Sequence, residues 1–148
     1  PPYLSEKESI EDAVQSAIDA APHVDKISIN PVNVQKNTVI EKMWFRNEWT
    51  APWLWSVVEV LKRCEDLPVR VYSDPTGGGT RRGAHNCHDC NKKILESLKN
   101  HRLSSGKFEG LHCDCKPRWD FLTKQSSLRR NGSEPHGYRS GFNESRHF

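Results

Sequence analysis

The sequence predicts an α/β fold in which helices pack against parallel strands. Two observations support this prediction: apolar residues recur at helical spacing in several segments, and two short segments have the composition and alternation of strands. The elements follow in the order helix, strand, helix, helix, strand, and strands separated by helices run parallel. At 148 residues with 34% hydrophobic side chains, the chain is long enough for one domain with a core.

The first predicted helix covers residues 5–20. Ser5 and Glu8 have the spacing of a capping box, in which each side chain binds the backbone N–H of the other residue. The apolar residues that follow recur at helical spacing, namely Ile10, Val14, Ala17 and Ile18. Pro22 ends the helix, because the residue before a proline disfavours helical geometry. Residues 26–30 alternate polar and apolar side chains before another proline, which predicts a short strand.

Residues 38–46 and 52–64 are predicted to form the next two helices. Thr38 and Glu41 repeat the capping-box spacing, and the later segment has a proline in its first turn, where the missing N–H is tolerated. Apolar side chains cover a wide face of this later helix, which predicts that it is largely buried. They are Leu54, Trp55, Val57, Val58, Val60 and Leu61. Residues 69–72 are then predicted to form a second strand.

The composition changes after residue 75, which predicts three parts. They are an α/β part over residues 1–75, a cysteine-rich extension over residues 76–125, and a basic tail over residues 126–148. Within the extension, apolar side chains predict helices near residues 91–101 and 119–122. The tail is rich in Ser, Arg, Asn and Gly and lacks periodicity, so we expect it to be disordered.

The charge is distributed unevenly along the chain. The first 75 residues carry 8 Lys and Arg against 12 Asp and Glu, a net charge of −4, whereas the remaining 73 carry 14 against 7, a net charge of +7. The basic half also holds the cysteine pairs, and a basic surface suits a polyanionic partner such as RNA. Alternatively, much of this charge belongs to a solvated tail.

The sequence carries no sign of membrane insertion or export. No segment approaches the roughly 18 apolar residues that a membrane span requires, and the N-terminus lacks the pattern of a secretory signal. We therefore expect a cytoplasmic protein without a membrane partner. The chain begins with Pro1 and Pro2 rather than with Met, so we expect that it was processed or is a piece of a longer protein.

Four of the five cysteines form two close pairs, Cys87 with Cys90 and Cys113 with Cys115. In a reducing cytosol such pairs indicate metal binding or redox chemistry rather than disulfides. Zinc favours four thiolates at the corners of a tetrahedron, and the 22 residues between the pairs leave room for a helix and a return. Because a closed four-sulfur shell has no open position for water, such a site holds structure and does not catalyse. The sequence therefore predicts a structural zinc site.

Other interpretations of these cysteines stay open. Four thiolates also suit an iron–sulfur cluster with an electron-transfer role, a CxxC pair can be a redox motif, and the thiols could be unrelated buried side chains. Three nearby histidines can replace a cysteine as ligand, namely His85, His88 and His112. Cys64 lies within the apolar helix and is expected to be a core residue.

Four polar residues lie at or just beyond the C-terminal end of the first predicted strand. They are Ser28, Asn30, Asn33 and Gln35. In α/β folds ligands bind at this end of the strands, and amide side chains there can hydrogen-bond a ribose, an adenine edge or a carboxylate. Alternatively, Asn and Pro in this segment serve only the geometry of a turn.

A glycine-rich loop at residues 76–83 contains Arg81 and Arg82, which are candidate RNA-binding residues. The loop lacks the GxxxxGKS or GxxxxGKT pattern of a Walker A motif, so it either approaches a phosphate or is a flexible linker. Four tryptophans can stack on bases, although such residues beside Leu and Val in helices are more often core. They are Trp44, Trp49, Trp53 and Trp55. No Ser/His/Asp constellation or carboxylate pair indicates hydrolysis.

Several segments together resemble a known family. The segments ISINPVNVQ at residues 27–35, TVIE at 38–41 and PWLWSVVEVL at 52–61 are similar to the archaeal radical SAM proteins of archaeosine biosynthesis, the RaSEA family. The segments GAHNCHDC at 83–90 and FEGLHCDC at 108–115 fit the C-terminal part of the same family. The resemblance covers the chain apart from its tail, and the family is related to the radical SAM enzymes that include the Elongator catalytic subunit.

The resemblance implies a partial TIM-like barrel, of which residues 1–75 supply the last βα units, followed by the cysteine-rich metal-binding extension. It also implies S-adenosylmethionine and a [4Fe–4S] cluster as cofactors of the complete enzyme. The implied role is tRNA modification: a partner transferase attaches lysine to the preQ0 base in the D-loop, and the radical enzyme cleaves that adduct to leave archaeosine. The same resemblance would place Ser28, Asn30, Asn33 and Gln35 at the mouth of the barrel, near S-adenosylmethionine or the base.

The cysteine spacing departs from the family. Radical SAM enzymes bind their cluster with a CxxxCxxC motif, and no such spacing occurs in this chain. We therefore expect the chain to be the C-terminal portion of such an enzyme and to be inactive alone. Its expected partners are tRNA, the missing N-terminal portion and the transferase. The alternative is a non-catalytic, zinc-stapled module that binds RNA without S-adenosylmethionine.

Overall fold

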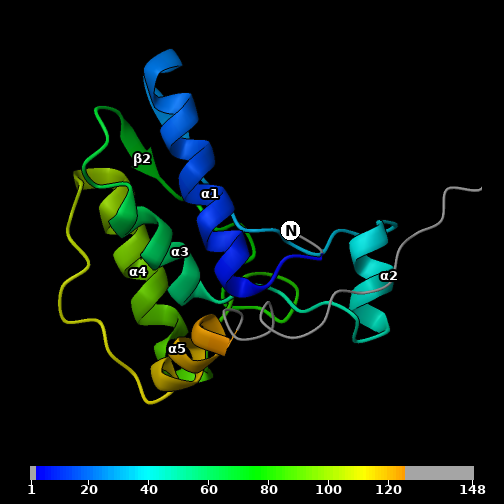
Figure 1. Ribbon diagram of the computed structural model, residues 1–148. Helices are drawn as coiled ribbons and strands as arrows, with labels where there is room; N and C mark the ends of the chain where they lie inside the picture. The colour runs from blue at the N-terminus through cyan, green and yellow to red at the C-terminus, as the bar shows by residue number, and fades with distance from the viewer. Residues whose placement is uncertain (1–2, 126–148) are drawn as a thin grey trace, which may run out of the picture.

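The computed structural model describes residues 3–125, which form five α-helices, one short 3₁₀ helix and a two-stranded sheet (Figure 1). In chain order the elements are α1 (Glu6–Ala20), the 3₁₀ helix η1 (Ala21–His23), β1 (Lys26–Ser28), α2 (Val39–Phe45), α3 (Leu54–Arg63), β2 (Arg70–Tyr72), α4 (His88–Ser104) and α5 (Lys116–Gln125). The α/β class is confirmed, and the predicted tail at residues 126–148 lies outside the described residues. None of the described helices has the length and apolar character needed to cross a membrane.

The capping box predicted at the start of α1 is present. The Ser5 hydroxyl accepts a hydrogen bond from the Glu8 backbone N–H at 3.2 Å, and the Glu8 carboxylate accepts one from the Ser5 N–H at 2.9 Å. Ile10, Val14 and Ala17 form the buried face of α1, which packs against α3 and α5. Side-chain capping and one buried face together define this helix.

β1 and β2 pair in parallel, as predicted, with Lys26–Ser28 aligned to Arg70–Tyr72. β1 is two residues shorter than predicted, because the chain is tied to the loop after β2 at Asn30. The side-chain Oδ1 of Asn30 accepts a hydrogen bond from the backbone N–H of Asp74 at 2.8 Å. The sheet of the described residues has only these two strands, so the partial TIM-like barrel stays a prediction.

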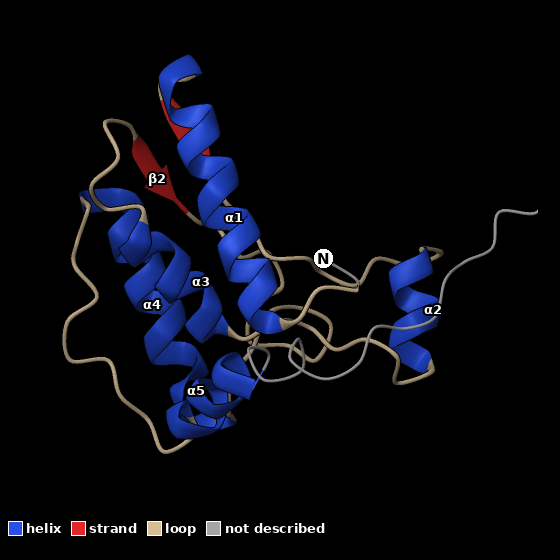
Figure 2. Cartoon of the chain, in the orientation of Figure 1, coloured by secondary structure: helices blue, strands red, loops and turns tan. Residues whose placement is uncertain are grey.

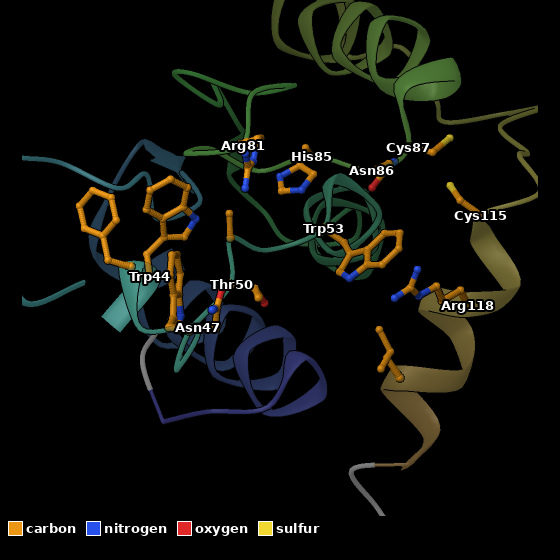
Figure 3. Close-up of a pocket in the computed structure, with 14 residues that line it drawn as sticks. Trp44, Asn47, Thr50, Trp53, Arg81, His85, Asn86, Cys87, Cys115 and Arg118 are labelled. Atoms are coloured by element: carbon orange, nitrogen blue, oxygen red, sulfur yellow. The ribbon is translucent and has the colours of Figure 1, made fainter. Parts of the chain in front are cut away.

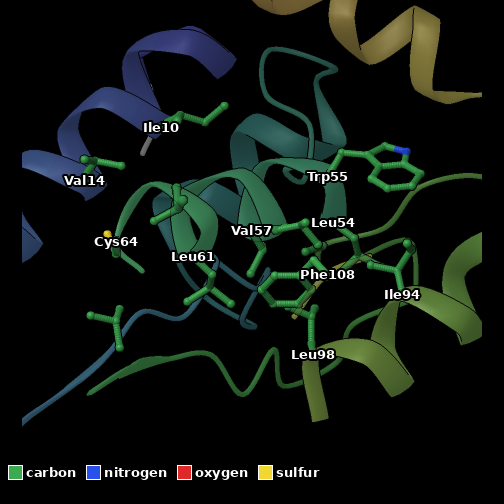
Figure 4. Close-up of a cluster of buried hydrophobic side chains, with 14 of the residues drawn as sticks. Ile10, Val14, Leu54, Trp55, Val57, Leu61, Cys64, Ile94, Leu98 and Phe108 are labelled. Atoms are coloured by element: carbon green, nitrogen blue, oxygen red, sulfur yellow. The ribbon is translucent and has the colours of Figure 1, made fainter. Parts of the chain in front are cut away.

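α3 lies at the centre of the hydrophobic core (Figure 4). Seven of its ten residues are buried because α1 and α4 both pack against it, as its wide apolar face predicts. Leu54 and Leu61 of α3 are at most 1% exposed, and Ile94 and Leu98 of α4 are fully buried beside them. Cys64 at the C-cap of α3 is also buried, as expected for a core residue.

A chain of hydrogen-bonded side chains, buried at Ser56 and Trp119, links three helices at the N-terminal turn of α3. The Trp119 indole N–H of α5 donates to the Ser56 hydroxyl at 2.7 Å, and Ser56 in turn donates to the Glu6 carboxylate of α1. The same carboxylate accepts the backbone N–H of Trp53 at 3.0 Å, which satisfies a donor at the start of α3. These bonds fix α1 and α5 relative to α3.

α2 stands apart from the other helices, as Figure 2 shows. Thr38 caps it by accepting the Glu41 backbone N–H at 3.1 Å, which confirms the predicted helix start. The Glu41 carboxylate pairs with Arg82 of the glycine-rich loop. α2 is therefore attached through that loop rather than through the helical core.

Replacing Leu61 by Ala should lower the free energy of unfolding by about 3 kcal/mol, because truncating a fully buried Leu removes its burial and leaves a cavity. The matched control is Leu103→Ala on α4, where the side chain is 63% exposed and the change should be less than about 1 kcal/mol. Urea denaturation of both variants measures the two effects. Equal losses would show that the core is not centred on α3.

Candidate metal centre

The four paired cysteines come together beside the start of α4, with their sulfur atoms all within 4.8 Å of one another. Sγ of Cys87 lies 3.6 Å from that of Cys90 and 3.4 Å from that of Cys113. Sγ of Cys90 lies 3.6 Å from that of Cys115. These separations exceed the roughly 2.05 Å of a disulfide, and all four are free thiols. Four thiols this close together could hold a metal ion.

The first pair is positioned by the start of α4. Cys87 is the N-cap of this helix and Cys90 lies in its first turn, where residues three apart lie on the same face. The helix predicted at residues 91–101 is therefore wrong at its N-terminal boundary, because α4 begins at His88. The CxxC pair belongs to the helix start rather than to a preceding loop.

The second pair is positioned by the start of α5. Figure 1 shows the segment after α4 running back beside that helix to reach α5. The reversal begins at Ser105, the C-cap of α4, whose φ of 55° is left-handed. Cys113 and Cys115 directly precede α5, and the Lys116 N–H donates to the Cys113 carbonyl at 2.9 Å. This tight turn places both sulfurs against the first pair.

Hydrogen bonds within the cluster favour one thiolate. Burial opposes ionisation of Cys87, but the backbone amide of Cys90 and the neighbouring thiols hydrogen-bond to its sulfur and lower its pKa to about 7. Burial instead raises the pKa of Cys90. The Trp55 indole N–H donates to the Cys115 sulfur at 3.4 Å, the kind of outer contact that orients a metal ligand. Because metal-bound cysteines are thiolates, a cation would balance the further negative charge.

The nearby histidines do not join the cluster, since the group of ligand atoms found within residues 3–125 comprises the four cysteines alone. His85 Nδ1 lies at a hydrogen-bond distance of 2.9 Å from the Gly83 carbonyl oxygen. His88 is fully exposed. Cys64 does not belong to the group either, and burial raises the pKa of its thiol.

The four polar residues predicted to line a ligand site have different surroundings. Asn30 Nδ2 donates to Ser28 Oγ at 3.1 Å, and the same side chain binds the backbone after β2. Asn33 lies against the glycine-rich loop, where a Cβ added to Gly77 would lie 2.8 Å from its Nδ2. Gln35 is exposed, and its carbonyl accepts a hydrogen bond from the residue that caps α2. Asn30 and Gln35 thus have turn-forming contacts, and a ligand role for the four stays a prediction.

Arg81 and Arg82 differ in their surroundings. The Arg82 guanidinium pairs with Glu41 and also donates to the Val34 carbonyl at 3.1 Å. Arg81 is exposed and lies over the Trp44 ring, 5.9 Å from its centre, without an ion-pair partner in the part of the chain that the structure describes. Arg82 therefore anchors α2 to the loop, whereas Arg81 is available to an external anion.

A cavity of about 800 Å³ opens beside the cysteine cluster, and the sequence did not predict it (Figure 3). Its aromatic walls are Trp44, Phe45, Trp49, Trp53 and His85. Arg81 and Arg118 also line it, as do two of the cluster sulfurs, those of Cys87 and Cys115. No acidic side chain is among its described lining residues.

The four tryptophans are divided between the core and this cavity. Trp55 is 2% exposed and belongs to the core, as residues of its type in an apolar helix usually do. Trp44, Trp49 and Trp53 are only partly buried and line the cavity. Position in the sequence could have distinguished Trp49 and Trp53 from the core residue Trp55, because Trp49 lies in a loop and Trp53 precedes the first turn of α3.

Comparison with curated proteins finds relatives over most of the chain. The chain is 40% identical over 125 residues to archaeosine synthase subunit beta of Methanosarcina acetivorans, a match covering 80% of this chain and 36% of that protein. It is 38% identical over 133 residues to archaeosine synthase subunit beta of Thermococcus kodakarensis, covering 86% of this chain and 41% of that protein. An uncharacterized protein of Methanocaldococcus jannaschii is 33% identical over 126 residues, which are 81% of this chain and 34% of that protein.

These relatives confirm the resemblance inferred from the sequence. The chain spans less than half the length of the relatives that it matches. No protein-family model matches the chain. No solved structure matches it significantly.

Replacing Cys90 by Ser should abolish stoichiometric metal binding, because a hydroxyl is a much poorer ligand than a thiolate for a thiophilic metal. The control Cys64→Ala removes a thiol outside the cluster and should leave the metal content unchanged. Elemental analysis of both proteins, purified without added metal, measures the outcome. A chelator should lower the melting temperature of the wild type but not that of Cys90→Ser. Equal metal content in Cys90→Ser and wild type would contradict a four-cysteine site.

The Glu41–Arg82 pair should make the attachment of α2 sensitive to acid. The hydrogen bond from Arg82, followed by that from the Asn37 backbone, holds the Glu41 pKa below its usual value of 4.5. A carboxylate with a lowered pKa contributes stability above its unfolded pKa, and that contribution is lost as the pH falls through the folded pKa. Thermal melts of wild type and Glu41→Gln should therefore differ at pH 6, and the difference should shrink as the pH falls below 4.5 toward the lowered pKa. A difference that does not vary with pH would refute this role.

Proposed function

We propose that this chain is part of an archaeosine synthase, a zinc-stapled portion of an enzyme that modifies tRNA. The observation that carries the proposal is its 38–40% identity, over 80–86% of its length, to two proteins named archaeosine synthase subunit beta. The cysteine cluster supports it, because the segments that resemble the RaSEA family include both cysteine pairs. In this proposal the reaction is the cleavage of a lysine–preQ0 adduct in the D-loop of tRNA.

The chain alone does not catalyse in this proposal. A radical SAM cluster requires CxxxCxxC, and the four paired cysteines are spaced differently. S-adenosylmethionine and the [4Fe–4S] cluster therefore belong to the part of the enzyme that this chain does not match. Residues 1–75 would supply βα units to a barrel, which agrees with the parallel pairing of β1 and β2, since parallel sheets normally belong to larger folds with both faces covered.

The compactness of the cluster favours zinc over an iron–sulfur cluster. Zn–S bonds of about 2.3 Å place four sulfurs on a tetrahedron with edges of about 3.8 Å. Three of the sulfur separations, at 3.4–3.6 Å, are close to that value, and all four sulfurs lie within 4.8 Å of one another. In a [4Fe–4S] cluster each cysteine binds a different iron, which sets the sulfurs farther apart. Zinc held here would fasten the starts of α4 and α5 and would have no open position for catalysis.

The charge distribution supports tRNA as a partner. The described part of the cysteine-rich half, residues 76–125, carries 10 Lys and Arg against 5 Asp and Glu, so the excess of positive charge is not confined to the tail. Basic surfaces of this kind bind nucleic acid through its phosphates. The name subunit beta, which both relatives carry, supports a partner protein as well, and we propose the lysine transferase in the cytoplasm for that role.

A non-catalytic, zinc-stapled RNA-binding module is the second candidate function. Four cysteine sulfurs favour this candidate, because a metal bound by all four has no open coordination position for a substrate. The two candidates differ in one measurable property: a binding module would bind tRNA equally well with and without S-adenosylmethionine and the rest of the enzyme.

A chimera tests the enzymatic proposal. This chain replaces the matching segment of the Methanosarcina acetivorans relative in an archaeal strain that lacks its own archaeosine synthase subunit beta. Mass spectrometry of nucleosides from total tRNA measures archaeosine, with the unmodified relative as positive control. We expect the chimera to restore archaeosine, its Cys90→Ser variant to lose it and its Cys64→Ala variant to retain it. A chimera that accumulates and binds metal but forms no archaeosine would refute the enzymatic proposal and leave the binding module.

A further inference from the structure

The cavity beside the cysteine cluster has no occupant in the proposed function. We propose that it binds a base of single-stranded RNA, with the adjoining phosphates held by Arg81 and Arg118. The inference rests on the proposed function in one respect, namely that the natural RNA would be tRNA. Its other support comes from the cavity itself: the aromatic walls, the two arginines, the size, and the absence of acidic side chains among its described lining residues.

The aromatic walls provide stacking surfaces for a base. Trp44 and Trp53 lie on opposite sides of the cavity, with His85 between them (Figure 3). The Phe45 ring is 67% exposed and meets Trp44 edge to face, with ring centres 5.1 Å apart. Aromatic rings that are at least partly exposed and gather around one opening are what proteins use to stack unpaired bases.

Two arginines at this opening have no anionic partner among the described residues. The side chains of Arg81 and Arg118 make no ion pair or hydrogen bond within the described residues, and both are exposed. The Arg81 guanidinium lies over the Trp44 ring, which leaves its N–H groups open to an anion. By contrast, Arg82 pairs with Glu41, and Arg102 pairs with Asp74. Guanidinium groups without a carboxylate partner, beside a cavity whose described lining residues include no acid, favour an anion, and their planar forks match the oxygens of a phosphate.

The dimensions favour a single unpaired nucleotide over a duplex. A volume of about 800 Å³ lies within the range of about 300–1,000 Å³ found for small-ligand pockets, so one nucleotide can enter. The stacked bases of a duplex cannot enter a pocket of this kind, because only a base turned out of its stack exposes both faces to aromatic rings. The expected ligand is therefore a loop or single-stranded segment of RNA.

Fluorescence anisotropy of the full chain tests this inference, with a short fluorescein-labelled single-stranded RNA and the same sequence in a duplex as probes. The charge variant is Arg81→Gln/Arg118→Gln, and its matched control is Lys99→Gln/Lys107→Gln, which removes two exposed charges that do not line the cavity. The aromatic variant is Phe45→Ala, and its control is Phe121→Ala at a ring that is 58% exposed outside the cavity.

We expect the wild type to bind the single strand at least about tenfold more tightly than the duplex. The arginine variant should lose about tenfold or more in affinity for the single strand, and Phe45→Ala about fivefold or more. Both controls should stay within about twofold of the wild type. All substituted side chains are exposed, and circular dichroism with metal analysis verifies that each variant is folded.

Three results would overturn the inference. The cavity variants could bind the single strand as tightly as the wild type, or the controls could lose as much affinity as the cavity variants. The wild type could also bind neither RNA probe or prefer the duplex. The last result would assign the cavity to another occupant, such as a protein segment. The proposed function fails separately. If the chimera forms no archaeosine, the proposed function is refuted even when RNA affinity depends on the cavity. If the cavity variants bind RNA like the wild type, the proposed function still stands.

Discussion

The capping of the first turn of α3 is the interaction on which the rest of the structure depends. Its backbone donors would be unsatisfied in the core without Glu6 of α1 and Asn86 before α4, which accept the N–H groups of Trp53 and Trp55. Two segments that are distant in the sequence must therefore lie against this turn before α3 can be buried. The same turn carries the Trp55 indole that reaches Cys115, so one piece of backbone positions both the core helix and the cysteine cluster.

This arrangement explains why the cluster and the cavity lie together. Asn86 caps α3 and directly precedes Cys87, so the contact that completes the helix also delivers the first cysteine pair. The second pair arrives with α5, which the Trp119 indole fastens to α3. Cys87 and Cys115 belong both to the cluster and to the cavity wall. An ion at the cysteines would therefore help to define the shape of the cavity.

Features that depend on neighbours in the sequence could be predicted, whereas those that depend on distant partners could not. The capping box at Ser5, the burial of α3, the parallel strands and both cysteine pairs follow from local spacing. Nothing in the sequence around Arg82 indicates that it pairs with Glu41. Likewise, nothing around Asn86 indicates that its side chain accepts the Trp55 N–H of a distant helix. The start of α4 was missed because cysteine is a poor N-cap by propensity. The cavity was missed because it joins three segments, each with an ordinary pattern.

The polar chain from Trp119 through Ser56 to Glu6 has a consequence for how related sequences can diverge. Each of the three side chains bonds the next, so replacing one of them leaves the buried hydroxyl, the buried indole or the half-buried carboxylate with one hydrogen bond fewer. A single substitution therefore carries a cost that a compensating substitution can remove. Glu6 and Ser56, 50 residues apart, and Ser56 and Trp119, 63 residues apart, should accordingly covary among related sequences.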